Sequence, residues 1–172
     1  MWKQIGIAVI AGWLPVGSLA SDQSPHQSPD IAGTLEGDSQ EWFVLSQGDD
    51  SNASFVEFGD DINIEITGFI DPERWDAQEA LSISLTVRDG QLMRADVLQL
   101  IGTSTSPPLY TSDGGDVTVS LTHYERDGQA LHVAGTIQGM LALQVQLGDP
   151  PDPNESIDID VTFDIEAQKI EF

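Results

Sequence analysis

The fold is decided by residues 117–137, which read VTVSLTHYERDGQALHVAGTI. Apolar and polar residues alternate on both sides of Asp127-Gly128, and a period of two is the pattern of a half-buried β-strand. Two such runs separated by a short glycine-containing turn predict an antiparallel hairpin. The same combination recurs along the chain, so we expect an all-β protein.

The register of this hairpin follows from the requirement that its apolar residues share one face. A three-residue turn at 126–128 pairs Leu121 with Val133 and Val117 with Ile137, whereas a two-residue turn separates the two apolar sets. A slip of one residue turns a whole strand inside out, so the pattern favours the three-residue turn. That turn places a glycine at its left-handed position, as hairpins of this type require.

A second copy of the tetrapeptide Arg-Asp-Gly-Gln, at 88–91, predicts a second hairpin. The same rule pairs Leu85 with Met93 and Leu81 with Val97. Ordinary turn chemistry explains the repeated tetrapeptide, so we do not interpret it as a duplication.

Further alternating runs occupy most of the chain around these two hairpins. Longer connections are expected at 102–116 and 148–156, and Asp71-Pro72 is a helix-start signal that predicts one short helical turn near 72–76. Nine or ten short strands predict a single antiparallel β-sandwich domain over 31–172, of jelly-roll or immunoglobulin-like type. The strands expected outside the two hairpins are 31–35, 41–45, 53–58, 62–70, 141–147 and 157–166.

Residues 1–20 have the composition of a secretory signal peptide rather than of a folded segment. Lys3 precedes an apolar run at 5–14, and Ser18-Leu19-Ala20 offers small residues at the two positions that a signal peptidase reads. The run is about half the roughly 20 residues of a membrane-spanning helix, so we expect cleavage after Ala20 and no membrane span afterwards. Residues 21–30 are expected to be a flexible polar leader, and the mature protein to be secreted or periplasmic.

The chain carries 29 Asp and Glu residues against 6 Lys and Arg, a formal net charge of −23, and it has no cysteine. A surface of this charge repels nucleic acid and anionic membranes, so neither is an expected partner. Without cysteine the chain has no disulfide and no thiol chemistry. The carboxylates are too numerous to single out a catalytic pair, so we predict no catalytic residue and no enzymatic activity.

Three acidic segments have the oxygen-rich composition of calcium-binding loops. Ca²⁺ takes several oxygen ligands from Asp and Asn side chains and from backbone carbonyls. The segments lack the spacing of an EF-hand loop, so they supply candidate ligands rather than a recognised motif. The candidate calcium ligands are Asp49, Asp50, Asn52, Asp113, Asp116, Asp149 and Asp152.

The chain has three histidines, His26, His123 and His132. In the register derived above, His123 lies opposite Leu131 and His132 lies opposite Thr122, which places the two imidazoles on different faces of the hairpin. Structural zinc also favours four ligands, usually with cysteine among them. No zinc or copper site is therefore predicted from these histidines.

The expected function is that of a non-catalytic binding or structural module of the periplasm, cell surface or secreted fraction, with an unknown protein or carbohydrate as its partner. One alternative is a calcium-assisted carbohydrate-binding module, in which Trp75 and Tyr110 stack on sugar rings. A second alternative is a small outer-membrane β-barrel, which fits the chain length and the terminal Phe172. The acidic residues Asp164 and Glu166 in its last strand argue against that alternative.

Overall fold

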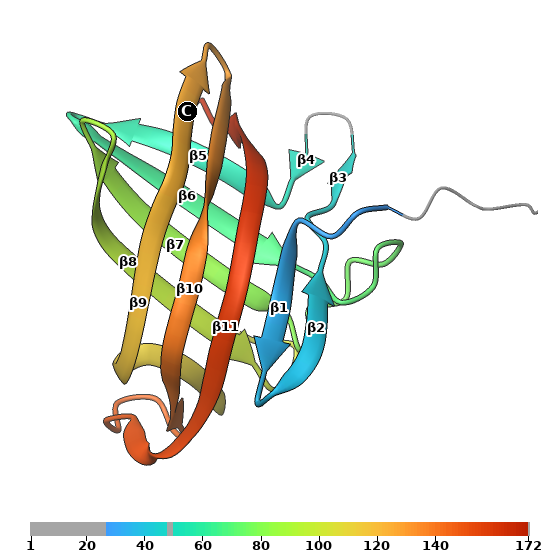
Figure 1. Ribbon diagram of the computed structural model, residues 1–172, viewed down its shortest axis with the longest axis vertical. Coiled ribbons are helices and arrows are strands. Elements are labelled where there is room, and N and C mark those ends of the chain that lie inside the picture. Colours follow the sequence, from blue (N-terminus) through green and yellow to red (C-terminus); the bar gives the residue numbers. More distant parts are fainter. Residues whose placement is uncertain (1–26, 48–49, 172) are drawn as a thin grey trace, which may run out of the picture.

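The computed structural model describes residues 27–47 and 50–171, which form two layers of strands (Figure 1). The front layer contains β9 (Leu109–Asp127), β10 (Ala130–Gln144) and β11 (Asp152–Lys169), with β1 (Ile31–Leu35) and β2 (Asp38–Trp42) added beside β11. The rear layer contains β5 (Ala53–Phe58), β6 (Asp61–Gly68), β7 (Leu81–Arg88) and β8 (Gln91–Leu100). A separate ribbon consists of β3 (Ser46–Gln47) and β4 (Asp50–Ser51). The predicted all-β antiparallel sandwich is confirmed.

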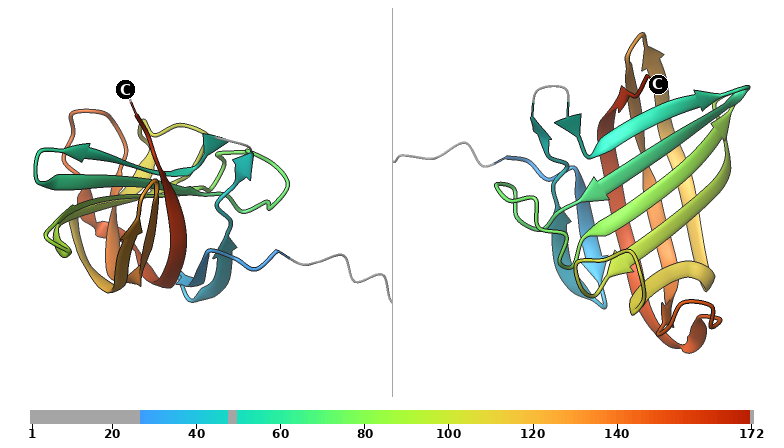
Figure 2. Two further views of the ribbon diagram at one scale, coloured as in Figure 1. Left: turned by 90° about the horizontal axis from the view of Figure 1, so that it is seen from above. Right: turned by 180° about the vertical axis from the view of Figure 1, so that it is seen from behind.

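The strands from β5 to β10 each pair with the next strand along the chain, so this part of the molecule is a meander. This strand order is simpler than the jelly-roll or immunoglobulin-like order that we expected. The two layers join at opposite corners, where β8 pairs with the start of β9 and where Gln168-Lys169 of β11 pair in parallel with Ser54-Phe55 of β5. From behind, β5–β8 cross the upright strands β9–β11 (Figure 2).

Strand β11 shows why this sequence forms a sandwich. Its odd-numbered residues from Ile157 to Ala167 are buried, and the even-numbered residues between them point to solvent. The predicted alternation of this strand is therefore confirmed. Burial of each large apolar side chain contributes about 1.5–3 kcal/mol relative to exposure. The largest buried side chains include Trp42, Phe55, Ile31, Ile64, Ile83, Leu131 and Ile137.

The turn of the β9–β10 hairpin has two residues, Gly128 and Gln129, instead of the three that we expected. The predicted register is therefore wrong. A bulge at Thr122 adds one residue to β9, which reverses the alternation and returns the apolar residues of β9 to the inner face. Beyond the bulge, Ile137 pairs with Val119, two residues from its predicted partner.

The β7–β8 hairpin departs from its predicted register in the same way. Its two-residue turn is Asp89-Gly90, with φ angles of 51° and 73°, and such double positive φ angles are typical of a type I′ turn. A bulge at Met93 then shifts the pairing, so that Leu81 lies opposite Gln99, two residues beyond its predicted partner. In both hairpins the turn is one residue shorter than we expected, and a bulge inside one strand supplies the extra residue.

Three predicted connections also differ from the structure. Strand β9 begins at Leu109, so the second half of the expected loop 102–116 is strand. Strand β11 begins at Asp152, which shortens the other expected loop. Asp71 Oδ1 accepts a 2.9 Å hydrogen bond from the backbone N–H of Glu73, and a turn forms there, whereas the described residues contain no helix.

The predicted signal peptide, most of the predicted leader and the candidate ligand Asp49 lie outside the described residues. Within the described ranges, no helix has the length and apolarity needed to cross a membrane.

Candidate functional site

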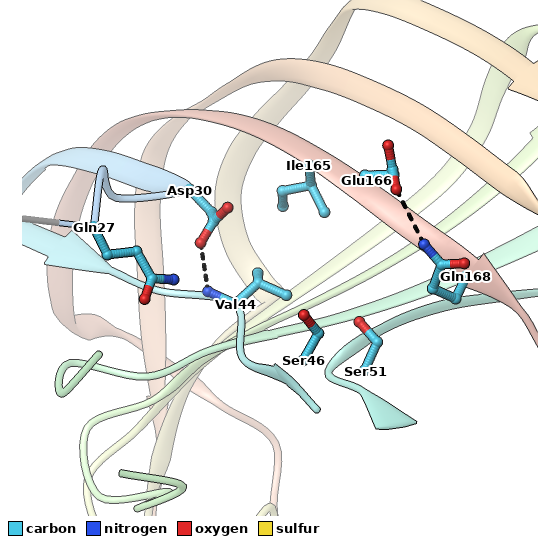
Figure 3. A pocket seen from close by; sticks show the side chains of 8 residues that line it. All are labelled: Gln27, Asp30, Val44, Ser46, Ser51, Ile165, Glu166 and Gln168. Atoms are coloured by element: carbon cyan, nitrogen blue, oxygen red, sulfur yellow. Dashed lines mark hydrogen bonds between the residues drawn. The ribbon is translucent and has the colours of Figure 1, made fainter. Parts of the chain in front are cut away.

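A polar groove lies where the residues before β1 meet the segments that follow β2 and β6. One part is a cavity of about 410 Å³ that Asp30, Glu166 and Gln168 line together with serines of β3 and β4 (Figure 3). A second cavity, of about 550 Å³, reaches Trp75. The two cavities share Gln27, Val44 and Ser46 as lining residues, so they adjoin. We refer to them together as the Asp30–Trp75 groove.

Asp30 holds the first wall of the groove in place. Its side-chain Oδ2 accepts a 2.6 Å hydrogen bond from the backbone N–H of Val44 (Figure 3). Its own backbone N–H donates to the carbonyl of Trp42 at 3.1 Å, and its carbonyl accepts from Asp164 at 2.9 Å. Burial raises the pKa of the Asp30 carboxyl, the negative charge of Asp164 raises it further, and the hydrogen bond from Val44 partly offsets both.

Trp75 forms the other end of the groove and is the only aromatic side chain that lines it among the described residues. Its side chain is 51% exposed, and its ring lies 6.4 Å from the ring of Phe69, centroid to centroid. Phe69 is anchored by two backbone hydrogen bonds to Phe43, of 2.7 Å and 2.8 Å. The indole is thus supported at its base and open to a ligand.

The groove between these two ends carries amide, hydroxyl and carboxylate groups. Gln168 Nε2 donates a 3.1 Å hydrogen bond to Glu166 Oε1, which orients both side chains along β11 (Figure 3). Ser46 and Ser51 are direct partners in the β3–β4 ribbon, so their side chains lie close together at the opposite wall. These groups are suited to hydrogen bonds with a polar ligand.

No protein-family model, characterised protein or solved structure matches this chain. Its function is therefore inferred from the residues alone.

Of the two predicted ligand-binding aromatics, Trp75 lines the groove and Tyr110 does not. Tyr110 lies in β9, half-buried against the main core, where it pairs with Gln99 and Leu143. Trp75 contacts Phe69 of the second hydrophobic cluster instead. The expected shelf of two aromatics is thus divided between two parts of the sandwich.

The predicted calcium ligands fall into two separate regions. Asp50 is exposed in β4, and Asn52 follows that strand with its Oδ1 buried and without a hydrogen-bond partner. Asp113 and Asp116 lie in β9, and Asp149 and Asp152 lie beside them at the same end of the front layer, because β9 and β11 both pair with the last part of β10. Within the described residues, no group of three or more His, Asp or Glu side chains is arranged around one metal position.

The prediction that His123 and His132 lie on different faces is wrong. Their rings are 4.5 Å apart, centroid to centroid. The two-residue turn and the bulge at Thr122 change the register, so both imidazoles point outward from the front layer.

Sequence reasoning also missed Asp30 and Gln27, because both fall in the polar stretch that we interpreted as a leader. The available signal was the position of Asp30, a carboxylate directly before the first buried residue, Ile31.

Proposed function

We propose that this protein is an exported, non-catalytic binding module and that its ligand is an uncharged carbohydrate chain held in the Asp30–Trp75 groove. The observation that carries this proposal is a supported, half-exposed tryptophan at one end of a groove lined by hydrogen-bonding side chains.

The chemistry of the groove matches that of a sugar. A sugar ring has an apolar face of C–H groups, which packs on an indole ring, and a rim of hydroxyls, which need donors and acceptors. Trp75 supplies the ring, and Gln27, Ser46 and Gln168 supply the polar groups. Cavities of roughly 300–1,000 Å³ are of the size that holds such ligands.

The charge of the site restricts the ligand. Asp30, Glu73 and Glu166 line the groove, and the whole chain carries a net charge of −23. A phosphate or a uronic acid would be repelled by this field. Neutral hexose or acetamido-sugar chains therefore fit the site best.

Asp30 has a positioning role in the proposed site. Its Oδ2 atom accepts the hydrogen bond from the backbone N–H of Val44, so this carboxylate shapes the groove. Export is inferred from the signal-like sequence at 1–20.

The test is a screen of neutral oligosaccharides on a glycan array, followed by calorimetry with the best ligand. Trp75→Ala is expected to weaken binding at least tenfold, which corresponds to about 1.4 kcal/mol. The matched control is Phe58→Ala, because Phe58 is an aromatic residue that is 79% exposed and does not line the groove. Equal affinities of the two variants would contradict the proposal.

A further inference from the structure

Two histidines and three carboxylates form a compact cluster on the outer face of the front layer. In β10, His132 lies between Glu125 of β9 and Glu166 of β11. Two residues further along β10, Ala134 lies between His123 and Asp164. Directly opposed residues on paired strands have their Cβ atoms about 4.5–5.5 Å apart. We refer to His123, Glu125, His132, Asp164 and Glu166 as the histidine cluster.

Each imidazole of the cluster is already associated with one carboxylate. His132 Nε2 lies 2.5 Å from Asp164 Oδ1, and His123 Nε2 lies 3.5 Å from Glu125 Oε2. A carboxylate on one ring nitrogen leaves the other nitrogen with its lone pair, which is how metal-binding histidines are commonly oriented. The two side chains are 43% and 46% exposed, so a solvated ion can reach them.

No cationic side chain of the described residues neutralises these carboxylates. The five Lys and Arg residues within the described ranges are all engaged in ion pairs with carboxylates outside the histidine cluster. Three carboxylates therefore lie close together beside the two imidazole rings. A bound cation would relieve this repulsion.

We propose that the histidine cluster binds a divalent cation of borderline softness, Zn²⁺ or Cu²⁺, through one nitrogen of His123 and one of His132. Imidazole favours these ions over Ca²⁺ and Mg²⁺, which take oxygen ligands. A metal about 2.0–2.1 Å from each nitrogen requires the two nitrogens to lie no more than roughly 4 Å apart. Rings whose centroids are 4.5 Å apart meet this condition after small side-chain rotations.

The remaining positions of the metal are filled by water, because Asp164 stays on Nε2 of His132. No three side chains of the described residues already converge on one metal position, so the site assembles as the exposed side chains rotate. Ala134, which lies between His123 and Asp164, has a small side chain and lines a cavity of about 340 Å³ together with Thr122 and Asp164.

The test is calorimetric titration of the protein with Zn²⁺, with Ca²⁺ as the comparison, and an electron paramagnetic resonance spectrum with Cu²⁺. We expect one Zn²⁺ per chain, nitrogen coordination of Cu²⁺, and at least a tenfold loss of zinc affinity in both His123→Asn and His132→Asn. The matched control is Asp160→Asn, an outward carboxylate of the same β11 strand that accepts a 3.1 Å hydrogen bond from Gln138. This control is expected to bind zinc as the wild type does.

Absence of zinc binding, or zinc binding that both histidine variants retain, would overturn the proposal. If a histidine variant does not fold, histidine NMR resonances of the wild-type protein decide the question. Zn²⁺ should then shift the signals of His123 and His132 together, and unchanged signals would overturn the proposal as well.

Discussion

The carboxylate of Asp30 accepts a 2.6 Å hydrogen bond from the backbone N–H of Val44. This contact joins the residues before β1 to the chain that leaves β2, and both segments line the Asp30–Trp75 groove. The carboxylate is partly buried, and burial is the main reason that its pKa is raised. The groove is thus maintained by a charged group in a place where its charge is unfavourable.

Asp30→Asn tests this contact through its pH dependence. The pKa of Asp30 is higher in the folded protein than in the unfolded chain. Asp30 therefore lowers the free energy of unfolding as pH rises from the unfolded-state pKa through the folded-state pKa. The free energy of unfolding of the wild type, relative to that of Asp30→Asn, should therefore increase as pH falls from neutral to acidic values. Urea denaturation at several pH values measures the free energy of unfolding of both proteins. If the difference between wild type and Asp30→Asn does not change with pH, the raised pKa of Asp30 is contradicted.

Asp30→Ala separates the hydrogen bond from the charge. Asparagine keeps an oxygen that can accept from Val44, whereas alanine leaves this N–H without its partner. Loss of one such bond costs about 1 kcal/mol, so Asp30→Ala should be less stable than Asp30→Asn at neutral pH. Equal stabilities would show that the bond contributes little.

Glu57 should show the opposite pH dependence. Hydrogen bonding to Lys169, with the charge of Arg126, lowers the pKa of Glu57. The contribution of Glu57 to the free energy of unfolding is fully present above its unfolded-state pKa. It is lost as pH falls through its folded-state pKa. Glu57→Gln should therefore be less stable than the wild type at neutral pH and equally stable in acid. The control is Glu41→Gln, which removes an exposed carboxylate of β2.

Gly135 tests the observed register of the β9–β10 hairpin. A Cβ at this position would lie 2.3 Å from the carbonyl oxygen of Ser120 and 2.7 Å from Cζ of Phe163. Gly135→Ala should cost about 1–3 kcal/mol, the usual cost of overpacking. Gly102→Ala is the matched control, because no atom lies within 4 Å of its added Cβ. If Gly135→Ala left the free energy of unfolding unchanged, the observed register of the β9–β10 hairpin would be contradicted.

The charge of the chain predicts a strong effect of salt on stability. Repulsion among the excess carboxylates opposes folding, and salt screens it. Sodium chloride should therefore raise the melting temperature. Calcium at matched ionic strength should act alike, because no three acidic side chains within the described ranges are arranged around a metal position. A larger effect of calcium, reversed by EDTA, would instead support the predicted ligands Asp113, Asp116, Asp149 and Asp152.

The sandwich was predictable because alternation of apolar and polar residues decides which face of each strand is buried. The inward set of β11, from Ile157 to Ala167, was evident for this reason. The register was not predictable, because a bulge at Thr122 or Met93 restores the same faces as a longer turn. The hydrophobic pattern alone does not distinguish between these two solutions.

The sites depend on that register and on contacts between distant segments. His123 and His132 meet only because the turn has two residues and a bulge follows it. Asp30 and Trp75 are brought to one groove by pairing of the chain around β1, β2 and β6, which no local pattern encodes. Trp75 itself was predictable, since a tryptophan in a polar connection between strands stands out as a candidate ligand platform.

The most direct test of the proposed function is a ¹H–¹⁵N NMR titration of the labelled protein with a neutral oligosaccharide selected on the array. We predict that the NMR signals of the Trp75 indole N–H and of the backbone amides of Gln27, Asp30, Val44 and Ser46 shift together, with one dissociation constant. Shifts confined to the outer face of β5–β8, or an unchanged Trp75 signal in the presence of bound ligand, would contradict it.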